Sequence, residues 1–371
     1  MKIINVFLMI TAVLWLSNCK HNTLSLPSIP TDEPQIGGNN YVQLNEVFDA
    51  AHGYHFNAPA DIYYGVDNFL YIADTKNDRI VMMDLGGGIM GYSQPIPHPE
   101  AISQNDSLDL LIVNKTNRIY KINLVKSQHR INEAKVEIAF EQSSEPTRQF
   151  TGISVHNGFE YYVTVVDSSV SPVLSQIYDF FGNNKLKGPL PLYANGSGLF
   201  SALIPTGIVS LREQYVDVSS SKEDTRAFIF CQSGSYPPAK LFNYYKVQFI
   251  TTVMFEGQEV LSPKTDLTGT PEEDYLYYYD KFYLPEDVAL DRAGNIFVID
   301  AGSPDGSHVP GFYRFGPTGQ QQQAVTGFGT GAYQFKTPKG IAVTPNTIQQ
   351  TVYIADTGNN RIVQYKLSKD L

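Results

Sequence analysis

Short apolar segments recur along the chain, each bounded by polar and turn-forming residues, and two of them lie in nearly identical sequences. Residues 71–81 read Tyr-Ile-Ala-Asp-Thr-Lys-Asn-Asp-Arg-Ile-Val, and residues 353–363 read Tyr-Ile-Ala-Asp-Thr-Gly-Asn-Asn-Arg-Ile-Val. Each copy predicts an apolar strand, a tight turn and a second apolar strand, which together make one β-hairpin. The chain is therefore expected to repeat one β-unit.

Six versions of this unit can be aligned along the sequence. In most of them a proline precedes the first, innermost strand, and the second strand ends at an equivalent position. These positions are Asp74, Asn114, Thr164, Cys231, Asp300 and Asp356. Their spacing matches or exceeds the roughly 40 to 50 residues of a four-stranded propeller blade. The third, fourth and fifth units are therefore expected to carry insertions, among them residues 167–203 and 256–280.

The motifs of this unit resemble a known family. Pro-x-Gly-Ile-Ala-Val, present at residues 338–343, is followed by an apolar strand ending in Ala-Asp-Thr and then by Asn-x-Arg-Ile. This combination resembles the NHL repeat and is strongest in the first and last units. The resemblance implies an all-β fold over residues 41–371, a six-bladed β-propeller of four-stranded antiparallel blades. Because a single blade cannot bury both faces, the blades are expected to stack in a closed ring.

The two ends of the repeat array are expected to close this ring together. The sixth unit has three strands of its own, the last of them at residues 361–367. Residues 41–48 alternate apolar and polar side chains, as a half-buried strand does. We expect this N-terminal segment to add the outer strand of the last blade.

The turn of the repeated hairpin contains an acidic and a basic residue that could be mistaken for a catalytic pair. They are Asp74 with Arg79, and Asp356 with Arg361. A tight turn uses such residues because the carboxylate accepts N–H groups of the turn and the guanidinium binds back to it. We interpret all four as structural.

The first 40 residues differ in composition from the repeats. Lys2 is followed by a mostly apolar run over residues 3–16, which is too short to span a bilayer but suits a secretory signal peptide at residues 1–18. Cys19 resembles the lipidated cysteine of bacterial lipoproteins, although Asn18 departs from the small residue favoured before it. The alternative is an ordinary signal peptide with a chance cysteine. Residues 19–40, punctuated by Pro, Gly and Asn, are interpreted as a flexible tether.

These features predict an exported bacterial lipoprotein that touches a membrane only through its lipid anchor, and Lys20 after the cysteine is compatible with the outer membrane. The chain has 37 acidic and 27 basic residues, a formal net charge of −10. Such a surface repels phosphate backbones, so nucleic acid is excluded as a partner. Cys231 lies in an apolar run and is interpreted as a buried side chain, so no disulfide is expected.

Candidate chemistry is placed at the predicted channel mouth, where the loops entering the innermost strands converge. The residue after the entry proline, or aligned with it, is expected to face this mouth: Ala60, Glu100, Thr151, Thr206, Glu286 and Lys339. Asp61 and Asp287 come next in sequence. Carboxylates from Asp61, Glu100, Glu286 and Asp287 could hold a hard cation such as Ca²⁺, and the resembling six-bladed lactonases use a central metal to polarise a carbonyl. The alternative is a solvated rim without a cofactor, partly neutralised by Lys339.

Two functions from different classes follow. The preferred prediction is noncatalytic and assigns no catalytic residue: a protein or glycan partner binds the inserted loops through Tyr275, Tyr277, Tyr278 and Tyr279. The same tyrosines could equally belong to an ordinary strand that buries alternate aromatics. The alternative function is a metal-dependent hydrolase or lyase at the channel mouth. An ion held by converging acids would favour the enzyme, and a broad exposed aromatic patch would favour the binder.

Overall fold

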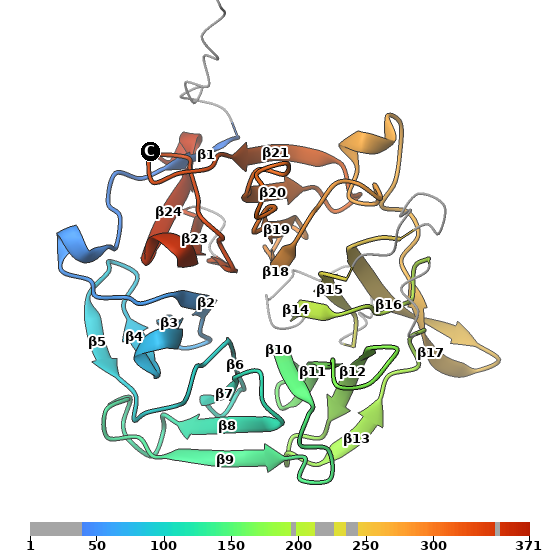
Figure 1. Ribbon diagram of the computed structural model, residues 1–371, viewed down its shortest axis with the longest axis horizontal. Helices are drawn as coiled ribbons and strands as arrows, with labels where there is room; N and C mark the ends of the chain where they lie inside the picture. The colour runs from blue at the N-terminus through green and yellow to red at the C-terminus, as the bar shows by residue number, and fades with distance from the viewer. Residues whose placement is uncertain (1–38, 194–197, 212–225, 235–243, 346–348) are drawn as a thin grey trace, which may run out of the picture. The chain divides into compact units, whose positions relative to one another are not determined.

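The computed structural model describes residues 39–193, 198–211, 226–234, 244–345 and 349–371 of the 371-residue chain. In this part of the chain, 24 strands form six four-stranded antiparallel sheets that surround a central axis as the blades of a propeller (Figure 1). The predicted six-bladed all-β fold is confirmed. The predicted signal peptide, Cys19 and nearly all of the predicted tether lie outside the described residues.

The first three blades run outward from the axis in sequence order. Blade 1 contains β2 (Pro59–Tyr64), β3 (Leu70–Asp74), β4 (Arg79–Met83) and β5 (Ile89–Tyr92). Blade 2 contains β6 (Ala101–Gln104), β7 (Asp109–Val113), β8 (Arg118–Asn123) and β9 (Val136–Glu141). Blade 3 contains β10 (Gln149–His156), β11 (Glu160–Asp167), β12 (Leu174–Phe180) and β13 (Leu186–Pro189). In Figure 1, β2, β6 and β10 lie nearest the axis and β5, β9 and β13 form the rim.

Blades 4 and 5 follow the same order, whereas blade 6 takes its outermost strand from the start of the repeat array. Blade 4 contains β14 (Pro205–Ser210), β15 (Phe228–Gln232), β16 (Val247–Phe255) and β17 (Gln258–Pro263). Blade 5 contains β18 (Pro285–Leu290), β19 (Ile296–Asp300), β20 (Gly311–Phe315) and β21 (Gln321–Thr326). Blade 6 contains β22 (Gly340–Val343), β23 (Thr351–Asp356), β24 (Arg361–Leu367) and β1 (Tyr41–Gln43).

The second strand of each blade is mostly apolar because each blade packs between two others. In β3, Leu70 and Ile72 belong to the core shared with blade 6, whereas Tyr71 and Ala73 belong to the core shared with blade 2. All four side chains are fully buried. Alternate residues of a strand face opposite sides of its sheet, so a sheet covered on both faces needs a continuous apolar run. This requirement explains the Tyr-Ile-Ala sequence of the repeat.

The N-terminal strand closes the ring. β1 pairs antiparallel with β24, with Tyr41 opposite Leu367. The buried Tyr41 ring packs edge to face on Phe297 of blade 5, with 5.6 Å between ring centroids. The Tyr41 N–H donates to Gln323 Oε1 at 2.7 Å, and Gln323 Nε2 donates to the Tyr41 carbonyl at 2.9 Å. One residue therefore ties blade 6 to blade 5 and the start of the array to its end.

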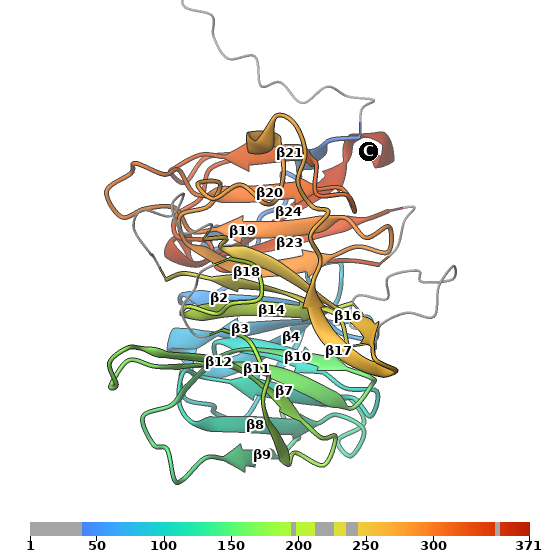
Figure 2. The same ribbon diagram turned by 90° about the vertical axis from the view of Figure 1, so that its right-hand side faces the viewer.

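The expectation that residues 167–203 and 256–280 are insertions is wrong for part of their length. The first range contains β12 and β13, and the second contains β17, which are regular outer strands of blades 3 and 4. Outer strands bury less surface than inner ones, so they carry little of the repeat motif. In blade 4, β16 and β17 continue outward as a long hairpin (Figures 1 and 2).

The helices of the described residues are single 3₁₀ turns. They are η1 (Ala50–His52), η2 (Thr75–Asn77), η3 (Glu272–Asp274), η4 (Thr357–Asn359) and η5 (Ser368–Asp370). None of the helices in this part of the chain is long and apolar enough to cross a membrane.

The turn residues of the repeated hairpin hold one another. Asp74 Oδ2 accepts hydrogen bonds from Arg79 Nε and from Asn77 Nδ2, both at 2.8 Å. The second copy has the same arrangement, with Arg361 Nε donating to Asp356 Oδ2 at 2.8 Å. Both aspartates are buried beneath their turns. The geometry agrees with a structural role for all four predicted turn residues.

We expect Tyr41→Ala to lower the free energy of unfolding by about 3 kcal/mol or more, as for other large buried aromatic side chains. Deletion of residues 41–49 should lower it further, because blade 6 then lacks its outer strand. Urea denaturation followed by circular dichroism measures both effects. Phe328→Ala is the matched control, since this ring is 66% exposed and its loss should cost less than about 0.5 kcal/mol. Equal midpoints for the two alanine variants would contradict closure through β1.

Candidate functional site

A pocket of about 250 Å³ lies on the axis where the six innermost strands begin. The residue at the start of each innermost strand lines it: Ala60, Glu100, Thr151, Thr206, Glu286 and Lys339. These are the six positions that the sequence alignment placed at the channel mouth. They meet because the innermost strands of all six blades surround one axis in the same orientation (Figure 1). Equivalent positions of these strands therefore lie at the same height along the axis.

Asp61 and Asp287 also line the pocket, but their carboxylates bind the backbone of the next blade. Asp61 Oδ2 accepts the N–H of Ile102 in blade 2 at 2.8 Å. Asp287 Oδ2 accepts the N–H of Ile341 in blade 6 at 3.0 Å. The two aspartates thus join innermost strands across the gap between blades. These bonds take up oxygen atoms that the sequence analysis offered to a metal ion.

Glycine occupies the same register in blades 4 and 6 because the innermost strands nearly touch there. A Cβ on Gly207 would lie 2.6 Å from the Cα of Asp287, and a Cβ on Gly340 would lie 2.6 Å from the Cα of Asp61. A neighbouring backbone cannot move aside as a flexible side chain can, so only glycine fits. The Gly of the Pro-x-Gly-Ile motif is therefore a packing requirement of the axis.

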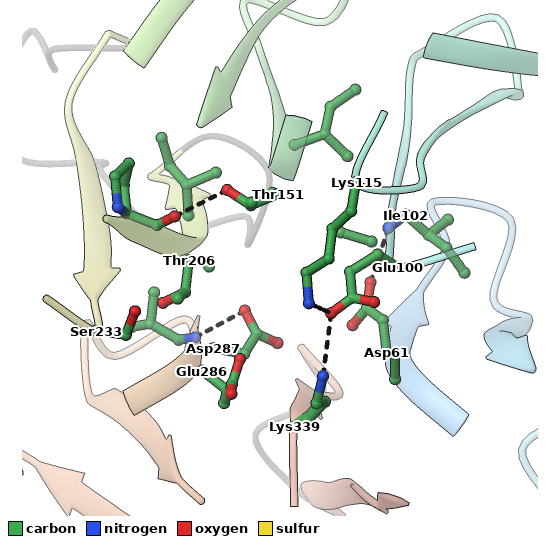
Figure 3. Close-up of a pocket in the computed structure, with 18 of the residues that line it drawn as sticks. Asp61, Glu100, Ile102, Lys115, Thr151, Thr206, Ser233, Glu286, Asp287 and Lys339 are labelled. Carbon is green, nitrogen blue, oxygen red and sulfur yellow. Dashed lines mark hydrogen bonds and ion pairs between the residues drawn. The ribbon is translucent and has the colours of Figure 1, made fainter. Parts of the chain in front are cut away.

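Two lysines converge on one carboxylate oxygen in the pocket (Figure 3). Lys339 Nζ lies 3.2 Å from Glu100 Oε1, and the Lys115 ammonium binds the same oxygen. Lys339 belongs to blade 6, and its side chain extends past blade 1 to Glu100 of blade 2. Blade 1 leaves room for it because its residue at the channel mouth is Ala60, which has only a methyl group. Burial raises the pKa of Glu100, but the Lys339 and Lys115 ammonium groups outweigh burial and hold this pKa below its ordinary value. Glu100 is therefore an ionised carboxylate whose Oε1 is shared by two ammonium groups.

Glu286 is the ring carboxyl without such a pairing. Blades 5 and 2 are three places apart in a ring of six, so Glu286 lies across the axis from Glu100. Within the described residues, its carboxylate takes part in no hydrogen bond or ion pair. Burial raises the pKa of Glu286, and the Lys339 and Lys115 charges offset only part of that rise. A carboxyl of this kind can exchange a proton with a molecule in the pocket.

Threonine hydroxyls complete the wall between the charged groups. Thr151 Oγ1 donates to the carbonyl of Pro205, and Thr206 Oγ1 donates to the carbonyl of Pro285, both at 2.8 Å. Each hydroxyl proton can thus be donated to the backbone of the next blade, although Thr151 Oγ1 also lies 2.8 Å from Thr164 Oγ1. An oxygen whose proton is donated in this way can still accept a hydrogen bond. This part of the wall can receive hydrogen bonds from a hydroxyl, an amine or a water molecule.

Lys115 is the site residue that the sequence analysis missed. It follows Asn114, at the position where the best-preserved repeats have Thr75 and Thr357. In those repeats the threonine hydroxyl donates to a proline carbonyl of the next blade. Lys115 instead extends to Glu100 (Figure 3). The replacement of the repeat threonine by Lys115 is the sequence feature that could have identified this residue as part of the site.

The pocket residues do not fit a divalent cation. Glu100 Oε1 is taken by two ammonium groups, and Asp61 and Asp287 accept backbone N–H groups. A calcium site needs six to eight oxygen ligands, and among these four acids only Glu286 has a carboxylate with no hydrogen bond or ion pair in the described residues. Across the described residues, no three His, Cys, Asp or Glu side chains are grouped as metal ligands.

The four predicted contact tyrosines do not form a broad exposed patch. Tyr277 is buried in the core between blades 4 and 5, and its hydroxyl donates to the Lys264 carbonyl at 2.8 Å. Its proposed role as a surface contact is therefore corrected to a core role. Tyr275, Tyr278 and Tyr279 are half-buried. Cys231 is a fully buried free thiol in the same core.

No protein-family model matches the chain, and no curated protein matches its sequence. Solved structures do share its architecture. A gluconolactonase from Xanthomonas campestris is similar over 88% of this chain and 91% of its own, at 11% identity and a TM-score of 0.55. A luciferin-regenerating enzyme is similar over 87% of this chain and 94% of its own, at 10% identity and a TM-score of 0.55.

A third similar structure is the calcium-binding protein regucalcin from Agrobacterium tumefaciens. It matches 88% of this chain and 94% of its own, at 11% identity and a TM-score of 0.52. At such low identities the likeness shows the six-bladed propeller fold. The resemblance to the NHL repeat stays a prediction from the motifs.

Asp61 gives the fold a pH dependence that can be measured. Burial raises the pKa of Asp61 to about 7, and the charge of Glu100 adds to this rise against the lowering effect of the Ile102 N–H. The ordinary value in an unfolded chain is about 3.9. The protonated carboxyl therefore stabilises the fold fully below pH 4, and this contribution is lost as the pH rises through about 7.

We expect Asp61→Asn, which keeps an acceptor oxygen without a titrating charge, to lose less stability than the parent protein between pH 4 and pH 7. Guanidinium denaturation at the two pH values measures the difference. Asp280→Asn, at an exposed aspartate, should follow the parent protein. The same loss in Asp61→Asn and in the parent would show that this carboxyl does not control the pH dependence.

Proposed function

We propose that this propeller is an enzyme of the hydrolase or lyase type whose substrate binds in the axial pocket. The observation that carries the proposal is Glu286, a half-buried carboxyl with a raised pKa and no partner in the described residues. Carboxyls with perturbed pKa values in clefts are candidates for functional groups. The gluconolactonase and the luciferin-regenerating enzyme that share the fold are named as enzymes, which agrees with this class.

The pocket limits the substrate to a small molecule. An apolar cavity of about 150 Å³ holds benzene, so a pocket of about 250 Å³ corresponds to about ten non-hydrogen atoms. Its wall mixes apolar side chains with polar groups, among them Glu100, Glu286, the two lysines and the hydroxyls of Thr151 and Thr206 (Figure 3). A compact, oxygen-rich molecule suits this wall better than an apolar one.

Glu286 would act as the general base and acid. In a hydrolysis, the ionised carboxylate accepts a proton from the water that attacks the substrate carbonyl. In an elimination, it accepts a proton from the carbon next to that carbonyl. In both cases the protonated carboxyl then returns the proton to the departing oxygen. Its raised pKa brings it closer to neutral pH, where both transfers are effective.

We expect Glu286→Gln to lower kcat about 10²- to 10⁴-fold on a substrate, because the amide cannot accept the proton. δ-Valerolactone and p-nitrophenyl acetate serve as first probes, followed by pH-stat and absorbance assays. Glu272→Gln, at an exposed glutamate, is the matched control and should keep full activity. An unchanged melting temperature for Glu286→Gln shows that the fold is intact. Equal turnover by the two variants would refute the assignment of Glu286.

The second candidate function is binding of a protein or glycan partner by a lipid-anchored propeller. It is favoured by the hairpin of β16 and β17, whose end exposes Val253, Met254 and Phe255. Met254 is 69% exposed and Phe255 is 63% exposed, although both are apolar. The hairpin projects away from the ring (Figure 1). Exposed apolar groups gathered on a projecting element are typical of contact surfaces.

We expect the double variant Met254→Ser/Phe255→Ser to lose any species that the full-length chain captures from solubilised envelopes. Phe328→Ser removes an equally exposed aromatic elsewhere and should retain that species. The same preparation tests the predicted anchor, since Cys19→Ser should release the chain from membranes. Capture that is equal in all variants would contradict a role for the hairpin, and membrane retention of Cys19→Ser would contradict the anchor.

A further inference from the structure

The axial pocket contains more acidic than basic groups. Asp61, Glu100, Glu286 and Asp287 face Lys115 and Lys339 across one small volume. Buried carboxylates are costly unless a cation or hydrogen-bond donors compensate them. Backbone N–H groups serve two of these acids, as described above. The other two, Glu100 and Glu286, depend on the lysines.

Lys339 is placed between these two glutamates. Its ammonium lies 3.2 Å from Glu100 Oε1. Burial lowers the pKa of Lys339, but the Glu100 and Glu286 charges outweigh burial and raise this pKa above its ordinary value. The Lys339 side chain is only 26% exposed and that of Glu100 only 12% exposed. A protein-borne cation therefore stands among ring carboxylates from opposite sides of the axis (Figure 3).

A divalent ion could not share this position. A calcium ion needs oxygen ligands at about 2.3–2.6 Å from several loops. Glu100 Oε1 already binds two ammonium groups, which would repel a further cation at such short range. The calcium-binding regucalcin shares the fold of this chain, so the same architecture is compatible with a metal in another sequence.

We propose that Lys339, assisted by Lys115, occupies the place of a divalent cation in this pocket and binds the ligand through a carbonyl or carboxylate oxygen. An ammonium group has three N–H donors. In the described residues, the ammonium of each lysine pairs with one acceptor, Glu100 Oε1, which leaves further N–H donors for a ligand. The free donors lie in the pocket, where a ligand oxygen can receive them. The claim that the lysines bind a ligand oxygen rests on the proposed function. The claim that they exclude a divalent cation does not.

The test is whether removal of the lysine creates a metal site. We expect the parent protein to bind no Ca²⁺, Mg²⁺ or Zn²⁺ in the millimolar range by isothermal titration calorimetry. Lys339→Ala removes one of the two ammonium groups on Glu100 Oε1, leaving Lys115 there, and opens the space beside Glu286. This variant should bind at least one of these ions tenfold or more tightly than the parent protein does. Adding Glu286→Gln to Lys339→Ala should remove the gained binding. Lys336→Ala, at an exposed lysine three residues earlier, should behave as the parent.

Equal ion affinity in the parent protein and Lys339→Ala, whether both bind or neither binds, would overturn the proposal. Lys339→Met keeps the apolar stem of the side chain and serves if the alanine variant does not fold. δ-Valerolactone is the oxygen probe, and Lys339→Met should weaken its binding at least tenfold. Binding of this probe by Glu286→Gln with full loss of turnover would support both proposals. If Glu286→Gln kept its turnover, the proposed enzyme function would fail, but the ion-binding results would still test the role of Lys339. The failure of one proposal can therefore be told from the failure of the other.

Discussion

The close approach of the innermost strands around the axis is the contact on which the rest of the molecule depends. Neighbouring strands meet there at glycine, and hydroxyl groups bridge the same gaps. Thr75 donates to the Pro99 carbonyl at 2.8 Å, and Thr357 donates to the Pro59 carbonyl at 2.7 Å. Because every blade has two buried faces, no blade is stable by itself. The ring needs its last gap closed, and β1 closes it.

This geometry also concentrates charge. Six equivalent strand positions meet on the axis, so side chains that are distant in sequence become near neighbours in one small pocket. Each buried acid then needs its own compensation. Asp61 and Asp287 take N–H groups of the next blade, and Glu100 takes two ammonium groups. The Glu286 carboxylate binds neither a backbone N–H group nor an ammonium group in the described residues. An acid that lacks such a partner is expected at a functional site.

The sequence predicted the inner half of each blade better than the outer half. The second strands of the blades, such as β3 and β19, are buried on both sides and carry a continuous apolar run, which is visible in one sequence. Outer strands such as β13 and β17 are partly exposed and lack that run, so their residues resembled insertions. The tyrosines near residue 277 show the same limit. Their spacing does not tell which ring enters a core, because burial of Tyr277 depends on strands from two blades.

By itself, the sequence determined the number of blades, their hairpin turns, the closing strand and the six positions at the channel mouth. The blades, the turns and the mouth positions recur in each repeat, and the closing strand shows its own alternation of apolar and polar residues. Local hydrogen bonds and apolar periodicity produce these features. Only the tertiary structure decided how the charges pair. Glu100 binds Lys115 of its own blade and Lys339 of blade 6, and no local pattern encodes a contact between residues 239 positions apart. Pairing across the axis is set by ring closure, which brings these groups within reach of one another.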